Sequence, residues 1–195
     1  MHASCVMAAC SDDAVLAATQ RWLERAVIGL NLCPFAKAVH TKKQIHYAIS
    51  HTTAATELLD ELRGELIGLA QAEPSVRDTT LWILPHRYPE FLEFNAFCAQ
   101  GERVLAALDL VGVLQIASFH PGFQFAGTLP DDITNCTNRA PYPMLHLLRE
   151  SSMDRAVAAY PQAETIYQKN METLQALGPA GWTALGVGPA EEPPP

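Results

Sequence analysis

The sequence predicts an α/β fold: a small, mostly parallel sheet of three to four strands covered by helices, with a helical segment at the C-terminus. Short apolar runs typical of strands alternate along the chain with longer runs in which apolar residues recur at helical spacing. Proline-containing polar segments separate these runs. Strands that alternate with helices in this way favour parallel pairing.

The first half of the chain contains two helices and one strand in this interpretation. A serine followed by two aspartates starts a helix over residues 12–31. Residues 44–50 alternate apolar and polar side chains, as a half-buried strand does. Thr52 or Thr53 then caps a helix that runs to about Gln71.

The middle of the chain continues the alternation. Residues 79–84 are almost continuously apolar, which predicts a strand covered on both faces. A helix over residues 90–108 and a third strand over residues 113–119 follow, and residues 123–126 are a candidate fourth strand.

The last third is expected to be helical. Residues 143–150 are predicted to form one short helix, and Ser151 or Ser152 caps another to residue 159. Pro161 starts a final helix that ends before Gly178.

The length and composition predict one domain. The chain has 195 residues, of which 49% are hydrophobic and 17% charged, a normal balance for a globular protein. We expect a flexible tail over residues 1–10, one α/β domain over residues 11–178, and a disordered Pro- and Gly-rich tail over residues 179–195.

The net charge and the distribution of cysteines indicate which binding partners and which cell compartment to expect. A formal net charge of −8 argues against non-specific binding to nucleic acid or to an anionic membrane. No apolar run approaches the length of a membrane span. The five cysteines are scattered, without a CxxC pair, as in proteins of a reducing cytosol, so we expect a cytoplasmic protein. The cofactor and the oligomeric state stay open.

The densest group of polar residues lies in Phe119–Glu150, which contains two His, two Asp, two Asn and two Arg. Polar loops that a scaffold holds in place are frequent locations of function. If the strands are parallel, the segments Pro85–Tyr88 and His120–Arg139 follow strand ends at one edge of the sheet.

The first functional hypothesis is an enzyme that acts on a small anionic metabolite. Pro34 either ends the first helix or takes the first position of a new helical turn. In the second case Cys33 is the N-cap of that turn, with a lowered pKa. Cys33 is then the catalytic nucleophile, and His120 or His146 the base. The alternative for Cys33 is a small buried hydrophobic residue.

The substrate of such an enzyme needs anchoring groups. Arg139 can bind a carboxylate or phosphate through two hydrogen bonds, and Asn138 can orient it. Tyr142 and Asn31 complete the predicted substrate-binding set.

Two other hypotheses remain. His120, His146 and Asp131 can ligate a metal, although their spacing matches no standard zinc signature. The alternatives are a strand-end His120 bonded to local backbone and a His146 that belongs to the core. The third hypothesis is a non-catalytic module that binds a ligand or partner, in which the polar segment is a rigid hydrogen-bonded structure.

Several stretches resemble one known family. They are the helix with Trp22-Leu23, GLNLCPFAKAV (Gly29–Val39), QIASFHPGFQFAGT (Gln115–Thr128) and DDITNCTNRAPYPMLHLLRE (Asp131–Glu150). Over about residues 12–178 the chain is similar to an uncharacterised bacterial family, the domain of unknown function 1415. The resemblance implies a bacterial origin and carries over no activity, substrate or cofactor.

Overall fold

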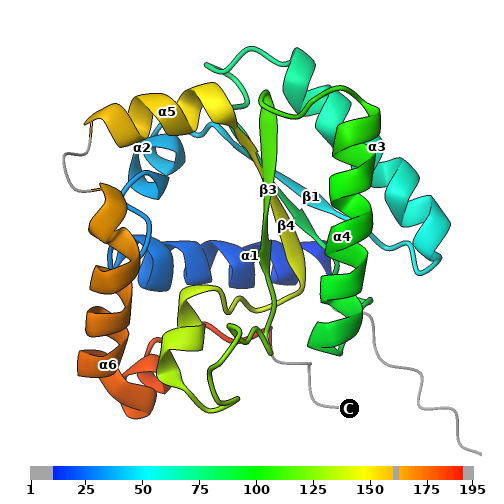
Figure 1. Ribbon diagram of the computed structural model, residues 1–195. Coiled ribbons are helices and arrows are strands. Elements are labelled where there is room, and N and C mark those ends of the chain that lie inside the picture. Colours follow the sequence, from blue (N-terminus) through cyan, green and yellow to red (C-terminus); the bar gives the residue numbers. More distant parts are fainter. Residues whose placement is uncertain (1–10, 160–162, 191–195) are drawn as a thin grey trace, which may run out of the picture.

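The computed structural model describes residues 11–159 and 163–190 and has three layers (Figure 1). The strands are β1 (Ile45–Ile49), β2 (Thr79–Ile83), β3 (Leu114–Phe119) and β4 (Met144–Arg149). The longer helices are α1 (Asp12–Trp22), α2 (Ala36–Thr41), α3 (Ala55–Gln71), α4 (Phe91–Ala107), α5 (Glu150–Ala159) and α6 (Ile166–Ala184). The short helices are η1 (Leu23–Ile28), η2 (Ile133–Thr137) and η3 (Ala163–Thr165).

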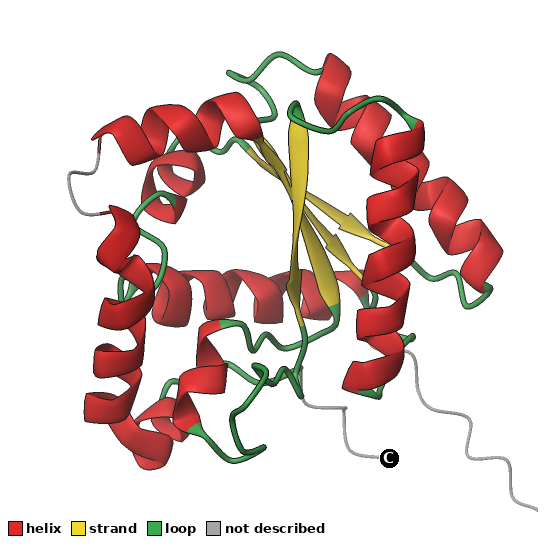
Figure 2. Cartoon of the chain, in the orientation of Figure 1, coloured by secondary structure: helices red, strands yellow, loops and turns green. Residues whose placement is uncertain are grey.

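The strands form one layer between two groups of helices (Figure 2). Helices α3 and α4 cover one face, and α1, α2 and α5 lie on the side of the other face (Figure 1). Buried apolar side chains fill both interfaces, because each strand sends alternate residues to opposite faces. On β2, for example, Trp82 packs toward α3 and α4, whereas Leu81 packs toward α1.

The sheet is mixed, so the expectation of a mostly parallel sheet is wrong. Its strand order is β1-β2-β4-β3. Strands β1 and β2 are parallel, but β4 lies antiparallel to both of its neighbours. The predicted helix over residues 143–150 is also wrong, because these residues contain β4. An apolar run of this length fits a strand or a helix equally well by periodicity.

Residues 123–126, the candidate fourth strand, belong to a loop. The other three predicted strands are confirmed as β1, β2 and β3, and the predicted helices over residues 53–71 and 90–108 are confirmed as α3 and α4. The predicted caps differ. The N-cap of α3 is Ala54, without a side-chain hydrogen bond, while Thr52 donates a hydrogen bond to Glu61.

The first predicted helix is confirmed as α1 followed by η1, which has the wider π-helical turn. Gly29 ends this turn, and its N–H donates to the carbonyl of Glu24, five residues earlier, at 2.9 Å. A Cβ atom on Gly29 would lie 2.3 Å from the carbonyl oxygen of Arg25. The π-helical geometry at this point therefore requires glycine.

The C-terminal region differs from the expectation. α6 contains a break at Gly178, where φ is 66°, and then continues to Ala184. Val187 is buried, so residues 179–190 pack against the domain instead of forming the expected disordered tail. Helix α5 begins at Glu150, ahead of the predicted serine caps. Pro161, the expected start of the last helix, lies outside the described residues, as do the expected tail residues 1–10 and 191–195.

Candidate functional site

The carboxyl ends of β2 and β3 lie at one edge of the sheet, because both strands run antiparallel to β4. The predicted meeting of Pro85–Tyr88 with His120–Arg139 is confirmed by a hydrogen bond between His120 Nε2 and the carbonyl oxygen of Tyr88, at 2.8 Å. The expected edge therefore forms even though the sheet is not mostly parallel.

His120 has a partner for each ring nitrogen. The N–H of Gly122 donates to Nδ1 at 2.9 Å, so the ring proton is on Nε2 and is donated to Tyr88. The side chain is 1% exposed and packs against Phe91 and Phe94. Burial lowers the pKa of His120, partly offset by the bond to the Tyr88 carbonyl. The geometry matches the structural alternative for this histidine, which joins two loops through their backbone.

The polar segment, Phe119–Glu150, forms hydrogen bonds between its own residues. The fully buried Asn135 accepts hydrogen bonds from the Phe125 N–H and the Thr128 hydroxyl, and donates to the Leu129 carbonyl. Asp132 caps η2 by accepting from the N–H and the hydroxyl of Thr134. These two bonds lower the pKa of Asp132. The side chains of this loop mainly hold its own shape.

The predicted substrate anchors also contact backbone. Arg139 donates to the carbonyls of Phe123 and Pro130, at 3.2 and 2.5 Å. Asn138 donates to the Ser118 carbonyl at 3.2 Å, and the Tyr142 hydroxyl accepts from the Ala190 N–H at 2.9 Å. The fourth, Asn31, is exposed in the left-handed conformation, with φ 55°, just after η1.

The turn around Asn31–Phe35 contacts the polar segment through apolar packing at Leu32, and α1 contacts the same segment through Trp22. Leu32 shares a buried cluster with Cys136 and Leu174. The indole N–H of Trp22 donates to the carbonyl of Arg139 at 2.8 Å.

A cavity of about 700 Å³ lies on the opposite face of the sheet from α3 and α4. Its floor consists of side chains from all four strands, among them Ile45, Leu81, Ala117, Phe119, His146 and Leu148. Trp22 and Val27 line it from α1 and η1, and Met153 and Ala156 line it from α5. Its volume falls within the range of about 300–1,000 Å³ that is usual for small-molecule sites.

His146 is a polar group within this mainly apolar floor. Its Nε2 atom lies 2.6 Å from the hydroxyl oxygen of Thr79, and that hydroxyl lies 2.6 Å from the carbonyl oxygen of Leu147. The ring is partly accessible, but it lies deep in the protein, and burial lowers the pKa of His146 to about 4. His146 is therefore neutral near pH 7.

Cys33 lies in the wall of the same cavity. Burial raises the pKa of the Cys33 thiol, against the lowering effect of hydrogen bonds from the N–H groups of Phe35 and Ala36. The N-cap of α2 is Phe35, without a side-chain hydrogen bond, so Cys33 is not the N-cap of this helix. The predicted lowering of the Cys33 pKa is also wrong. Desolvation outweighs the N–H groups, so the thiol stays protonated at neutral pH.

The rim of the cavity is polar. The hydroxyl of Ser152 donates to Asp78 at 2.6 Å and accepts from Arg155 at 2.9 Å. Lys42 and Gln44 also line the cavity. An apolar interior thus opens toward a rim with both positive and negative charges.

The predicted metal ligands are not brought together. His120 packs against α4, His146 faces the cavity on the other side of the sheet, and Asp131 is exposed on the loop. Within residues 11–159 and 163–190, no three His, Cys, Asp or Glu side chains gather closely enough to hold a metal ion.

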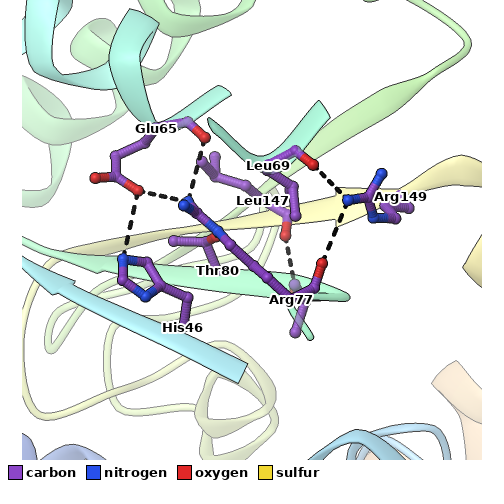
Figure 3. Close-up of polar contacts among 8 residues, drawn as sticks. His46, Glu65, Leu69, Arg77, Thr80, Leu147 and Arg149 are labelled. Carbon is purple, nitrogen blue, oxygen red and sulfur yellow. Dashed lines mark hydrogen bonds and ion pairs between the residues drawn. The ribbon is translucent and has the colours of Figure 1, made fainter. Parts of the chain in front are cut away.

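A second polar cluster lies between α3 and the sheet (Figure 3). Arg77 donates to the Glu65 carboxylate at 2.5 Å and to the Thr80 hydroxyl at 2.9 Å, and His46 lies 3.9 Å from the same carboxylate. The guanidinium of Arg149 donates to the carbonyls of Leu69 and Ala72 at the end of α3, and to that of Arg77 in the connector before β2. This cluster satisfies a helix terminus.

The floor residues Thr79, Leu81 and Leu148 were not among the predicted site residues. A signal for part of the floor exists in residues 144–149, because a strand interpretation places His146 and Leu148 on one face. Because residues 143–150 were interpreted as a helix, this shared face was not recognised.

Comparison with known proteins gives a family without an assigned function. Among the described residues, no helix combines the length and apolar character needed to cross a membrane. No similar curated protein and no similar solved structure was found. Residues 14–184 match the model of one family, described as a protein of unknown function (DUF1415). With most of its length matched, the chain belongs to the DUF1415 family.

Proposed function

We propose that this protein binds a small, largely apolar molecule in the cavity between the sheet and helices α1, α2 and α5. The observation that carries this proposal is a cavity of about 700 Å³ with an apolar lining and one neutral histidine on its floor. Sites for small molecules typically combine an apolar lining with a few polar groups that fix orientation.

The rim supports an anionic outer end of this ligand. Lys42 and Arg155 both line the cavity from exposed positions, where they attract a carboxylate or phosphate at low cost in desolvation. This proposal moves the small anionic ligand expected from the sequence away from Arg139, whose donors contact backbone carbonyls.

Binding is tested with small aromatic compounds and with a variant that fills the cavity. Leu148→Trp places a large ring in the floor, and Leu92→Trp, at a position 79% exposed on α4, is the matched control. We expect naphthalene-sized compounds to change the fluorescence of Trp22 and raise the melting temperature of the wild type and of Leu92→Trp. Leu148→Trp should lose this response. An equal response in Leu148→Trp would mean that the compounds bind elsewhere.

A second candidate function is thiol chemistry on the bound molecule, supported by the position of Cys33 and His146 along one cavity. The raised pKa of Cys33 and the lowered pKa of His146 both disfavour the thiolate in the free protein. Catalysis would therefore require the ligand to change these environments. Alkylation at pH 8, in a Cys5→Ser/Cys10→Ser background, tests it by mass spectrometry. Faster labelling of Cys33 than of Cys98 with ligand bound favours this function, and protection of Cys33 favours simple binding.

A further inference from the structure

We propose that His146 acts as a fixed hydrogen-bond acceptor, so that the cavity selects molecules whose inner end is an uncharged O–H or N–H donor. An ether or a carboxylate at that end is disfavoured. The inference rests on the proposed binding function and adds the chemical class of the ligand.

The hydrogen atoms available to Thr79 and His146 determine the tautomer of the ring. The Leu147 carbonyl oxygen only accepts, so the 2.6 Å contact from Thr79 uses the single hydroxyl proton of that threonine. The contact between Thr79 and His146 Nε2, also 2.6 Å, then requires the ring to be the donor. His146 therefore carries its proton on Nε2, and Nδ1 has a free lone pair.

The protein supplies no donor to this lone pair. Across residues 11–159 and 163–190, no side chain or backbone group hydrogen bonds to Nδ1, and the atom is not enclosed. The neighbouring floor residues Ala117, Phe119 and Leu148 are apolar. Because His146 lines the cavity, a donor group on a bound ligand can satisfy Nδ1.

The acceptor role is stable at neutral pH. Thr79 is buried and donates its hydroxyl proton to the β4 backbone, so its oxygen accepts from Nε2. Thr79 is therefore a positioning residue that fixes the ring tautomer. Protonation would turn Nδ1 into a donor, but burial holds the pKa of His146 near 4. A ligand that presents a second acceptor would leave two buried lone pairs facing each other, at a cost in affinity of about tenfold to a hundredfold.

The probes are 1-naphthol and 1-methoxynaphthalene, which share the ring system and differ in the hydroxyl proton. Calorimetric titration at pH 7 should give at least about tenfold tighter binding of 1-naphthol to the wild type. His146→Phe should bind both probes with similar affinity. Thr79→Val should lose most of the preference, because Nε2 then has no acceptor and the ring is free to adopt the other tautomer.

A spectroscopic measurement on the wild-type protein tests the tautomer without depending on the folding of any variant. Long-range ¹H–¹⁵N spectra of the wild-type protein should show a neutral His146 protonated on Nε2, and 1-naphthol should shift the Nδ1 resonance. A proton on Nδ1 in the free protein would overturn the inference without any ligand. Equal affinity for the two probes would overturn it while the binding function stands. Failure of all naphthalene-sized compounds to bind removes the proposed function and this inference with it.

Discussion

The imidazole of His120 joins two segments 32 residues apart, by donating from Nε2 to the Tyr88 carbonyl while Nδ1 accepts from the backbone of Gly122. Tyr88 has a positive φ of 57°, an uncommon conformation for a residue with a large side chain. The histidine thus stabilises a strained turn at the edge of the sheet.

Replacement of this ring tests its structural role. His120→Phe keeps the packing against Phe91 and Phe94 but leaves a buried carbonyl and an N–H without a partner. We expect a loss of about 2–3 kcal/mol in the free energy of unfolding, measured with urea. His86→Phe, at an exposed position, is the control and should change stability by less than about 0.5 kcal/mol. Equal effects of the two changes would contradict the structural role.

The lowered pKa of His146 predicts a pH dependence of stability. Between its ordinary pKa of about 6.5 and its folded value of about 4, the unfolded chain holds a proton that the folded protein does not. Stability from this group is therefore complete above pH 6.5 and is lost as the pH falls toward 4, a difference of about 3 kcal/mol.

His146→Gln removes this titration and leaves other groups in place. The variant should show a flatter dependence of unfolding free energy on pH between about 4 and 6.5 than the wild type. His120, whose pKa is also lowered, contributes equally to both proteins. Parallel curves would show that His146 does not stay neutral in the folded protein.

The π-helical turn at η1 predicts opposite effects of alanine at two glycines. Gly29→Ala places a Cβ 2.3 Å from the Arg25 carbonyl oxygen, which the backbone must move to avoid. The expected cost is about 1–3 kcal/mol in the free energy of unfolding. Gly64→Ala, in an exposed and open position on α3, should instead stabilise by about 0.5–1 kcal/mol. Thermal unfolding of both variants checks this, and two changes of the same sign would contradict it.

The buried side chain of Arg149 donates hydrogen bonds to the C-terminal end of α3. It is 8% exposed and donates to the carbonyls of Leu69, Ala72 and Arg77. Arg149→Met leaves these acceptors without their charged donor, so we expect a loss of about 3 kcal/mol. Arg103→Met, on the exposed face of α4, is the matched control and should be nearly neutral. Hydrogen exchange should rise at the end of α3 in the first variant only.

Sequence patterns predicted the elements that carry their own signals. β2 lies in an almost continuously apolar run between polar connectors, and α3 and α4 repeat apolar residues at helical spacing, so local residues determine their type. β4 has six residues and directly precedes α5, without a turn to separate them. Its conformation depends on pairing with β2 and β3, which are distant in sequence.

The candidate site was harder to predict from the sequence, because it too depends on contacts made in the folded protein. The polar segment was located, but the number of polar side chains did not reveal that Asn135 and Arg139 bond to nearby backbone. The cavity is lined by residues from four strands and several helices, so it exists only once the sheet has assembled.

The position of β4 has a consequence for synthesis of the chain. The strand that joins β2 to β3 is the last of the four to leave the ribosome, although it lies inside the sheet. Until about residue 149 has emerged, β2 and β3 each present an unpaired edge, which is prone to pair with other chains. The long sequence separation between β2 and β4 also predicts slow closure of the sheet. Nascent chains that stop before Met144 should therefore be the ones that engage chaperones or aggregate.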